Sequence, residues 1–248
     1  MEFKKILLMI PTYRRKNRLQ KLIDSALKYS YDVNNIRFCF CVNVSDKETQ
    51  NYLAERYFPL GDGQFEIILE KTRQPNLSKY FNMMYDETRF DDPDTLVSEL
   101  GDDMYFKTQD WDKKILDVMN AGDGYNIVYC NDNFIAYDQC CVNLFTSRKL
   151  VSATNRPFMC PLFKADMVDV VWTLVGQYTG LLRYLPDVII QHEHDSGKKA
   201  TERDETFNRL GPVRKAANAG DNHKIAKFYS VLTAKDLILK GVGQWKNS

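Results

Sequence analysis

Apolar and polar positions alternate in blocks along the first 130 residues of the chain. Short continuous apolar runs predict buried β-strands at residues 6–10, 36–44, 65–69, 95–100 and 125–130. Between these runs, apolar residues recur every three or four positions, as in the stripe Leu19, Leu22, Ile23, Ala26 and Leu27, which predicts amphipathic helices. Strands that alternate with helices predict an α/β fold with a mainly parallel, doubly wound sheet and helices on both faces.

The pattern changes after residue 132. Residues 133–137 and 141–146 predict a short hairpin, and a helix is expected over residues 165–178. Residues 182–185 and 188–192 read as strands separated by Pro186-Asp187. The remainder predicts a polar loop followed by helices at about 201–219 and 222–239.

Polar side chains follow four of the predicted strands: Thr12, Asn43, the pair Asp102 and Asp103, and the pair Asn131 and Asp132. The carboxyl ends of parallel strands meet at one edge of a sheet, where α/β proteins bind ligands. Two adjacent carboxylates there, combined with phosphate oxygens, would suit a hard divalent cation. The same Gly101-Asp102-Asp103 sequence is also ordinary turn chemistry, so both interpretations stay open at this point.

Charge is unevenly distributed in a chain whose formal net charge is +1. Residues 86–112 hold ten acids against two basic residues, whereas residues 196–248 hold eleven Lys and Arg against five acids. These segments could be solvated faces or two sides of a site for an anionic substrate. Arg14, Arg15, Lys16 and Arg18 crowd the start of the first helix, which favours a bound anion there.

Composition is typical of a soluble globular protein. No apolar run approaches the roughly 20 residues that a membrane-spanning helix needs, so we expect a cytoplasmic protein. The six cysteines show no metal-binding spacing and are expected to be reduced, buried thiols.

Four segments carry a likeness to a known family, in this order: ILLMIPTYRRKNRLQKLIDSAL (6–27), ELGDDMYFKTQDWD (99–112), FKADMVDVVWTL (163–174) and PDVIIQHEH (186–194). Their order and spacing resemble a family-2-type GT-A glycosyltransferase, most closely the small members found in phage genomes. The resemblance implies a GT-A domain at residues 1–195, with a nucleotide-binding half to about 132 and an acceptor half at 133–195. A basic helical extension, residues 196–248, would pack on the same domain.

The resemblance also implies an enzyme that moves a sugar from a nucleotide-diphosphate sugar, expected to be a UDP-sugar, to an acceptor hydroxyl with inversion. Asp103 would bind Mn²⁺ or Mg²⁺ together with His192 or His194, which share a face of the strand. Asp166 would be the general base, with Asp169 as the alternative. The nucleotide would contact Thr12, Arg14, Asn43, Asn76, Lys79 and Asp102. Asp132 and Trp111 would contact the sugar or the acceptor, although Trp111 fits a core position on the inward stripe of its helix equally well.

Two features depart from the family pattern. The second strand ends in Asn43-Val44-Ser45-Asp46 rather than Asp-Asp or Asp-Gly-Ser, and Met104 follows the acidic pair where a second hard ligand is expected. A nucleotidyltransferase is the first alternative, although residues 11–15 lack the glycine of a phosphate loop. A nucleotide-sugar binding module without catalysis is the second. The acceptor could be a hydroxymethylated base of phage DNA, a glycan or a protein; the near-neutral charge gives DNA no strong support.

Overall fold

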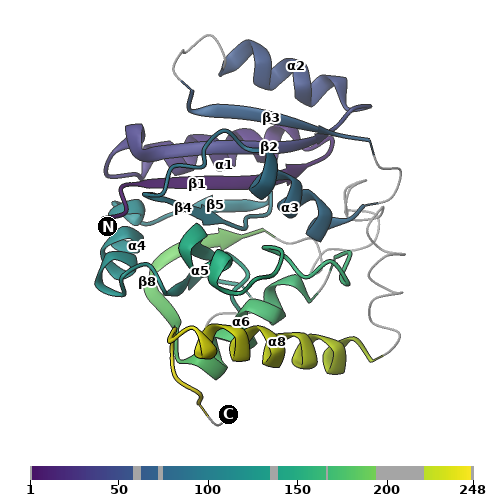
Figure 1. Ribbon diagram of the computed structural model, residues 1–248. Helices are drawn as coiled ribbons and strands as arrows, with labels where there is room; N and C mark the ends of the chain where they lie inside the picture. Colours follow the sequence, from purple (N-terminus) through teal and green to yellow (C-terminus); the bar gives the residue numbers. More distant parts are fainter. Residues whose placement is uncertain are drawn as a thin grey trace.

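A computed structural model describes residues 2–57, 63–71, 75–134, 139–165, 167–193 and 221–246. Within these ranges the strands form one sheet of order β3-β2-β1-β4-β7-β6-β8-β5 (Figure 1). The strands are β1 (Lys5–Thr12), β2 (Ile36–Asn43), β3 (Phe65–Glu70), β4 (Thr95–Ser98), β5 (Met104–Phe106), β6 (Ile127–Asn131), β7 (Phe145–Ser147) and β8 (Leu182–His192).

The sheet is mainly parallel, as the alternation of strands and helices predicts. Strand β1 pairs in parallel with β2 and β4, β2 pairs in parallel with β3, and β6 pairs in parallel with β8. Strand β7 lies antiparallel between β4 and β6, and β5 lies antiparallel to β8. Strands β1, β2 and β4 therefore end at the same edge of the sheet, which is the right-hand side of Figure 1.

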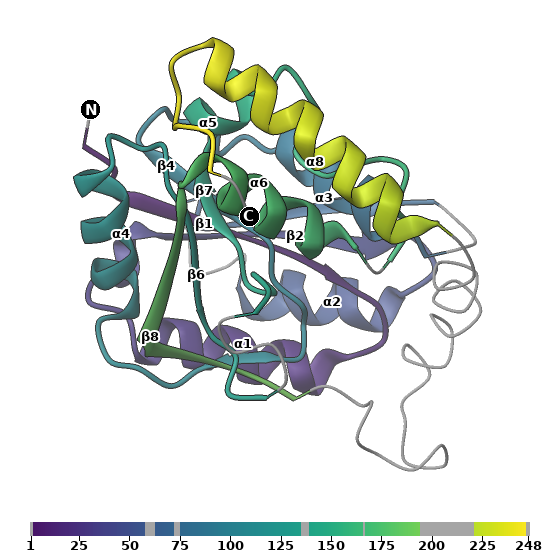
Figure 2. The ribbon, with the colours of Figure 1, turned by 90° about the horizontal axis from the view of Figure 1, so that it is seen from below.

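Helices cover both faces of the sheet (Figure 2). Helices α1 (Lys16–Lys28), α2 (Lys47–Arg56) and α4 (Trp111–Ala121) pack on one face. Helices α3 (Leu77–Glu87), α5 (Arg148–Ala153), α6 (Val168–Thr179) and α8 (Asn222–Leu239) pack on the other. Strand β1 is apolar on both sides because Ile6, Leu8 and Ile10 face the first group, while Leu7 and Met9 face the second.

The second half of the chain differs from the prediction in three places. No hairpin forms over the described part of residues 133–146: β7 begins only at Phe145 and pairs with β4 and β6, and residues 135–138 lie outside the described ranges. The helix expected from residue 165 begins at Val168. Strand β8 is continuous, and the pairing shifts from Cys130–Leu185 to Asn131–Ile189, so Pro186 lies in a bulge where its missing N–H costs no ladder bond.

The C-terminal helix α8 has the predicted bounds, whereas the helix predicted at residues 201–219 lies outside the described ranges. Helix α8 packs against α6, and the Ser230 hydroxyl donates to the carbonyl of Val171 at 3.2 Å. Among the helices that the structure describes, none has the length and apolar character needed to cross a membrane.

Candidate active site

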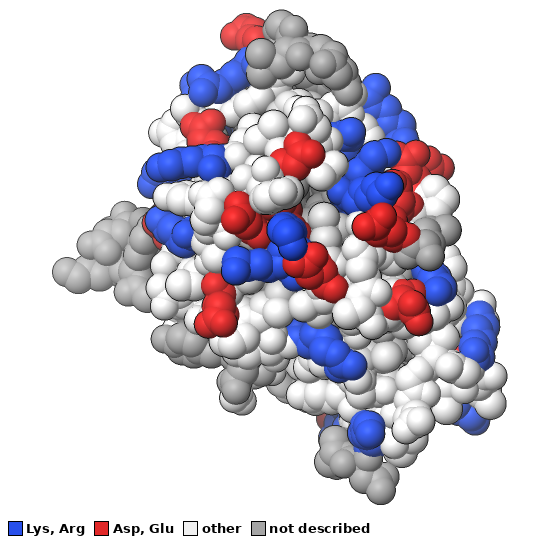
Figure 3. Space-filling view, turned by 90° about the vertical axis from the view of Figure 1, so that its left-hand side faces the viewer, with Lys and Arg blue, Asp and Glu red and all other residues white. Residues whose placement is uncertain are grey.

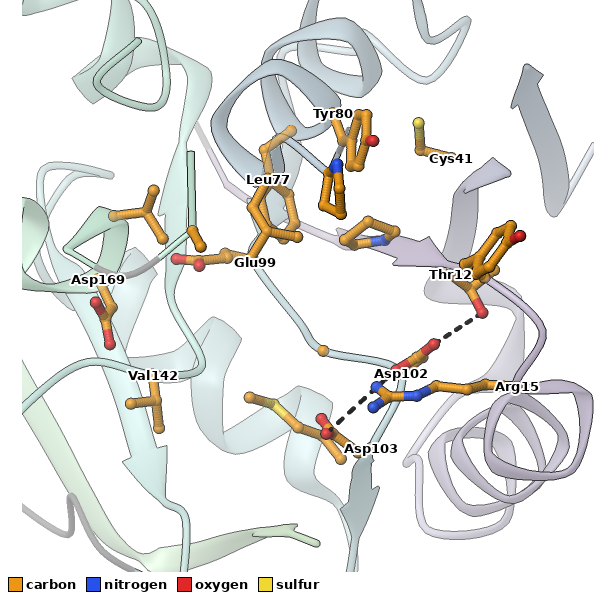
Figure 4. A pocket seen from close by; sticks show the side chains of 18 of the residues that line it. Thr12, Arg15, Cys41, Leu77, Tyr80, Glu99, Asp102, Asp103, Val142 and Asp169 are labelled. Carbon is orange, nitrogen blue, oxygen red and sulfur yellow. Dashed lines mark hydrogen bonds and ion pairs between the residues drawn. The ribbon is translucent and has the colours of Figure 1, made fainter. Parts of the chain in front are cut away.

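A cavity of about 270 Å³ opens where β1, β2 and β4 end and where α6 begins (Figure 4). One end is lined by Cys41, Glu70 and Tyr80. Asp102, Asp103 and His192 also line it, and Figure 4 shows Asp169 at the end far from Cys41 and Thr12, with the Glu99 carboxyl turned toward Asp169. Polar residues from the ends of separate strands, Thr12 of β1, Glu70 of β3 and His192 of β8, therefore line one pocket together with Asp102 and Asp103, as expected for an open parallel sheet.

Asp102 is held by two residues from the first strand–helix connection. The Thr12 hydroxyl donates to Oδ2 of Asp102 at 2.8 Å, and Nη1 of Arg15 donates to Oδ1 at 2.6 Å. Burial raises the pKa of Asp102 above its usual value and the neighbouring Asp103 adds to this, whereas Arg15 and Thr12 act in the opposite direction. The carboxylate of Asp102 is thus fixed in orientation and is screened by a buried guanidinium.

Asp103 faces His192, with 3.4 Å between its Oδ1 and the imidazole Nε2. The pairing of β5 with β8 creates this contact, because Met104 lies opposite His192 and the Glu193 N–H donates to the carbonyl of Asp103 at 2.8 Å. Gly101 leaves space for the carboxylate: a Cβ there would lie 2.6 Å from Oδ1 of Asp103.

The donor set of Asp103 and His192 fits a divalent cation in part. A carboxylate oxygen and an imidazole nitrogen at this separation can both reach one Mn²⁺ or Mg²⁺ ion. Among the described residues there is no group of three or more such side chains that could hold a metal. The remaining ligands would therefore be water and phosphate oxygens, as is common for Mg²⁺. His194 lies outside the described ranges.

Two further carboxyl groups lie at the far end of the pocket. Glu99 follows β4, and Asp169 lies in the first turn of α6; Figure 4 shows the Glu99 carboxyl directed toward the Asp169 side of the pocket. Burial raises the pKa of Glu99 well above its usual value, and the charge of Asp169 raises it further. Asp166, the predicted general base, lies outside the described ranges.

The fold is shared with proteins of known structure, whereas the sequence alone shows no relative. No protein-family model matches the sequence, and no curated protein matches it by sequence. The mannosyltransferase PcManGT from Pyrobaculum calidifontis, in complex with GDP-Man and Mn2+, matches with a TM-score of 0.61 and 12% identity, over 98% of this chain and 77% of that one. The 1–349 segment of S. aureus TarS in complex with UDP-GlcNAc gives 0.59 and 11% identity, over 95% and 73%.

GalNAc-T7 with UDP, GalNAc and Mn2+ matches with a TM-score of 0.61 and 9% identity, over 77% of this chain and 44% of that one. A longer TarS structure is covered to 41%. This chain has the GT-A glycosyltransferase fold. It spans less than half the length of the GalNAc-T7 chain and of the longer TarS chain.

Within this GT-A fold, the predicted nucleotide contacts divide into two groups. Thr12 and Asp102 line the pocket. Asn43 is buried outside the lining, where its amide donates to Glu70 and its oxygen accepts from the Ser45 N–H at 3.0 Å. Asn43 therefore contacts Glu70, which lines the cavity, and a direct contact of Asn43 with the nucleotide stays a prediction.

Three other predicted nucleotide contacts are absent from the lining. Arg14 has a left-handed backbone (φ 53°), and its N–H donates to Asp46 at 2.6 Å. Asn76 accepts from the Lys79 N–H at 3.0 Å and so caps helix α3. Asn76 and Lys79 border a separate shallow depression with Asn82. The cap thus occupies the side-chain oxygen of Asn76, whereas Lys79 contributes only its backbone N–H.

Trp111 is not a sugar or acceptor contact in this conformation. Its side chain is fully buried, its Nε1–H donates to the carbonyl of Ala26 at 2.9 Å, and its ring centroid lies 4.2 Å from that of Phe106. Asp132 is also buried outside the lining, and its backbone carbonyl accepts from the His192 N–H at 3.0 Å. Trp111 is thus a core residue, and Asp132 supports the strand that carries His192.

The sequence did not single out three charged residues that line the pocket: Arg15, Glu70 and Glu99. The cluster of cations at the start of α1 suggested a bound anion, but Arg15 and Arg18 approach the protein's own acids, with Nη1 atoms 3.6 and 3.7 Å from Oδ2 of Asp103. Glu99 stood out only as one of many acids in its segment. Its place directly after a buried strand, next to the acidic pair, is the signal that could have identified it.

The acidic segment as a whole does not form one side of the GT-A pocket. Of its ten acids, those that line the pocket are Glu99, Asp102 and Asp103. Asp92 pairs with Lys5 at 2.7 Å, at the beginning of β1 and thus at the opposite end of the sheet. Figure 3 looks toward that end and shows acidic and basic side chains intermixed over the surface. Asp86, Glu87, Asp91 and Asp92 are exposed, so this part of the acidic run is a solvated face.

Proposed function

We propose that this protein is a metal-dependent glycosyltransferase that moves a sugar from a nucleotide-diphosphate sugar to an acceptor hydroxyl. The observation that carries the proposal is the contact between Asp103 and His192, 3.4 Å apart in the middle of a pocket at the carboxyl ends of parallel strands. Structures with this fold support it, since PcManGT was solved in complex with GDP-Man and Mn2+, and TarS in complex with UDP-GlcNAc. A UDP-sugar is our first choice of donor.

Asp103 and His192 would hold Mn²⁺ or Mg²⁺. The bound ion would offset the negative charge of the diphosphate leaving group. Asp102, held by Thr12 and Arg15, would lie beside the ribose or a metal-bound water. Glu70, at the other end of the pocket and held by Asn43, would face the nucleotide base.

A carboxylate on the acceptor side would take the proton of the acceptor hydroxyl while its oxygen attacks the anomeric carbon. One carbon–oxygen bond forms to the acceptor, and the bond to the diphosphate breaks, so that a single displacement inverts the anomeric centre. Asp166 is the first candidate for this base and Asp169, which lines the pocket, is the second.

The test is donor hydrolysis and transfer with Mn²⁺, for wild type and for Asp103→Ala, Asp166→Asn and Asp169→Asn. Loss of activity in Asp103→Ala and in one of the two Asn variants is expected. Asp117→Asn is the matched control, because Asp117 lies on the exposed side of α4 and pairs with Lys113 at 2.6 Å. Full activity in all three site variants would overturn the residue assignment.

A nucleotidyltransferase is the less favoured alternative. That chemistry uses two metals on clustered carboxylates, whereas this pocket places a histidine and a guanidinium beside its acidic pair. Incubation with nucleoside triphosphates and release of pyrophosphate would favour it. Binding of a nucleotide sugar without turnover on any acceptor would favour a binding module instead.

For the acceptor, we propose either a hydroxymethylated base of phage DNA or a glycan, with a protein as the remaining choice, and with the reaction in the host cytoplasm if a phage encodes the chain. Duplex DNA binding that falls steeply with salt would favour DNA, because phosphate contacts release counterions. A thermal-shift screen of nucleotide sugars with Mn²⁺ would identify the donor first, since a tight ligand raises apparent stability.

A further inference from the structure

Glu99 is a buried acid with a carboxyl oxygen that makes no hydrogen bond within the described part of the protein. Its residue is 7% exposed, and its Oε2 has no hydrogen-bond partner among the described residues. Its backbone N–H donates to the carbonyl of Leu144 at 2.9 Å, which anchors the main chain and leaves the side chain to the cavity. An unpaired buried carboxyl destabilises a fold, and such groups are concentrated at functional sites.

The position of Glu99 relates it to the diphosphate site proposed above. Residues 99–103 form one connection after β4, with Asp103 beside His192 and with the Glu99 carboxyl turned toward Asp169 in the same pocket (Figure 4). A group attached to a diphosphate beside Asp103 therefore extends toward Glu99 and Asp169. Val142, Ala165 and Val168 line that end, so an occupant meets apolar walls together with two carboxyl groups.

This combination of surfaces matches a sugar ring. A sugar presents C–H faces to apolar side chains and hydroxyl groups at its edge. A neutral carboxyl offers one donor and one acceptor, which complements a hydroxyl group that can do the same. Two carboxyl groups in one pocket also tend to separate in protonation state, so that one stays neutral while the other is ionised.

We propose that Glu99, in its neutral form, hydrogen-bonds a hydroxyl group of the transferred sugar and thereby determines which sugars the pocket accepts. Asp169 on the opposite wall is the ionised partner of this pair. Burial and the Asp169 charge both raise the pKa of Glu99, which supports the neutral form. The inference rests on the proposed glycosyltransferase function, because it requires a nucleotide-linked sugar in the pocket.

The test measures dissociation constants with Mn²⁺ for the nucleoside diphosphate and for its nucleotide sugar, in wild type, Glu99→Ala and Glu99→Gln. Glu99→Ala is expected to raise the dissociation constant of the nucleotide sugar roughly tenfold or more, as for a lost buried hydrogen bond. The dissociation constant of the nucleoside diphosphate should stay within about twofold of wild type. Glu99→Gln keeps a donor and an acceptor and should bind the sugar nearly as wild type does. Glu55→Ala, an exposed acid on α2, is the matched control.

Deoxy analogues of the sugar locate the contact. Removing one hydroxyl should weaken binding to wild type about tenfold and leave binding to Glu99→Ala unchanged, since the partner is already absent. If Glu99→Ala lowers the affinity for the nucleoside diphosphate as much as the affinity for the nucleotide sugar, or lowers neither affinity, the inference is wrong. If Glu99→Gln loses as much affinity for the nucleotide sugar as Glu99→Ala does, Glu99 does not act in its neutral form. If wild type neither binds nor transfers any nucleotide sugar, the proposed function itself is wrong. If wild type does both and only the expected effects of the Glu99 variants are absent, the inference alone is wrong.

Discussion

Oδ1 of Asp103 lies 3.4 Å from Nε2 of His192, although the two residues come from segments far apart in the sequence. The antiparallel pairing of Met104 with His192 sets this distance, because β5 and β8 present the two side chains at the same edge. The contact joins the acidic connection after β4 to the last strand of the sheet.

Replacing His192 with alanine should weaken Mn²⁺ binding at least about tenfold, since changes even to the residues around metal ligands have effects of that size. Calorimetric titration with Mn²⁺ measures it directly. His223→Ala is a matched control, because His223 is exposed on α8. Equal Mn²⁺ affinity of the two variants would remove His192 from the metal site.

Replacing Arg15 with alanine should destabilise the protein by about 3–5 kcal/mol near neutral pH, because the buried carboxylate of Asp102 would lose its 2.6 Å partner. The loss should shrink at acidic pH, since the unpaired Asp102 can take up a proton. Urea unfolding at two pH values measures both effects. Arg56→Ala is the control: Arg56 is 3.8 Å from Asp24 in an exposed pair, and its removal should change stability little. Similar effects in the two variants would contradict the buried pair.

Glu99 should make stability fall as pH rises. The raised pKa means that the folded protein keeps a proton on Glu99 after the unfolded chain has released it, so stability is lost from about the usual value of 4.5 upward, through the raised value. The slope from one group is at most about 1.4 kcal/mol per pH unit. The charged group that influences Glu99 is the Asp169 carboxyl.

Unfolding free energies of wild type and Glu99→Gln between pH 4 and 8 test this. The variant cannot titrate at this position, so the difference between its free energy of unfolding and that of wild type should grow in favour of the variant as pH rises. Glu55→Gln, on the exposed face of α2, should run parallel to wild type. If the Glu99→Gln and wild-type curves also run parallel, the carboxyl is not buried as described.

Trp111→Phe should lower stability and leave catalysis intact. The variant keeps most of the packing against Phe106 but leaves the carbonyl of Ala26 without its donor, which costs about 1–3 kcal/mol. Chemical unfolding gives the stability, and donor and acceptor KM values give the role in binding. A raised KM without loss of stability would return Trp111 to the sugar or acceptor site.

Much of the fold could be predicted because its signal is local. Continuous apolar runs such as residues 6–10 mark strands buried on both faces, and the intervening stripes mark helices. Strand β5 was missed because three residues are too few to show a period. For Trp111 both a core position and a sugar or acceptor contact stayed open, because an aromatic residue at the start of a helix looks the same in sequence whether it faces the core or the pocket.

The sequence by itself determined the alternation of strands and helices, and with it the sheet edge at which Thr12, Asp102 and Asp103 gather, since side-chain periodicity along a segment reports which faces are buried. Only the tertiary structure decided that His192 meets Asp103, that Arg15 binds Asp102, and that Glu99 turns into the cavity opposite Asp169. These contacts depend on strand register and helix placement between distant segments, and no local pattern encodes the distance between two side chains brought together by folding.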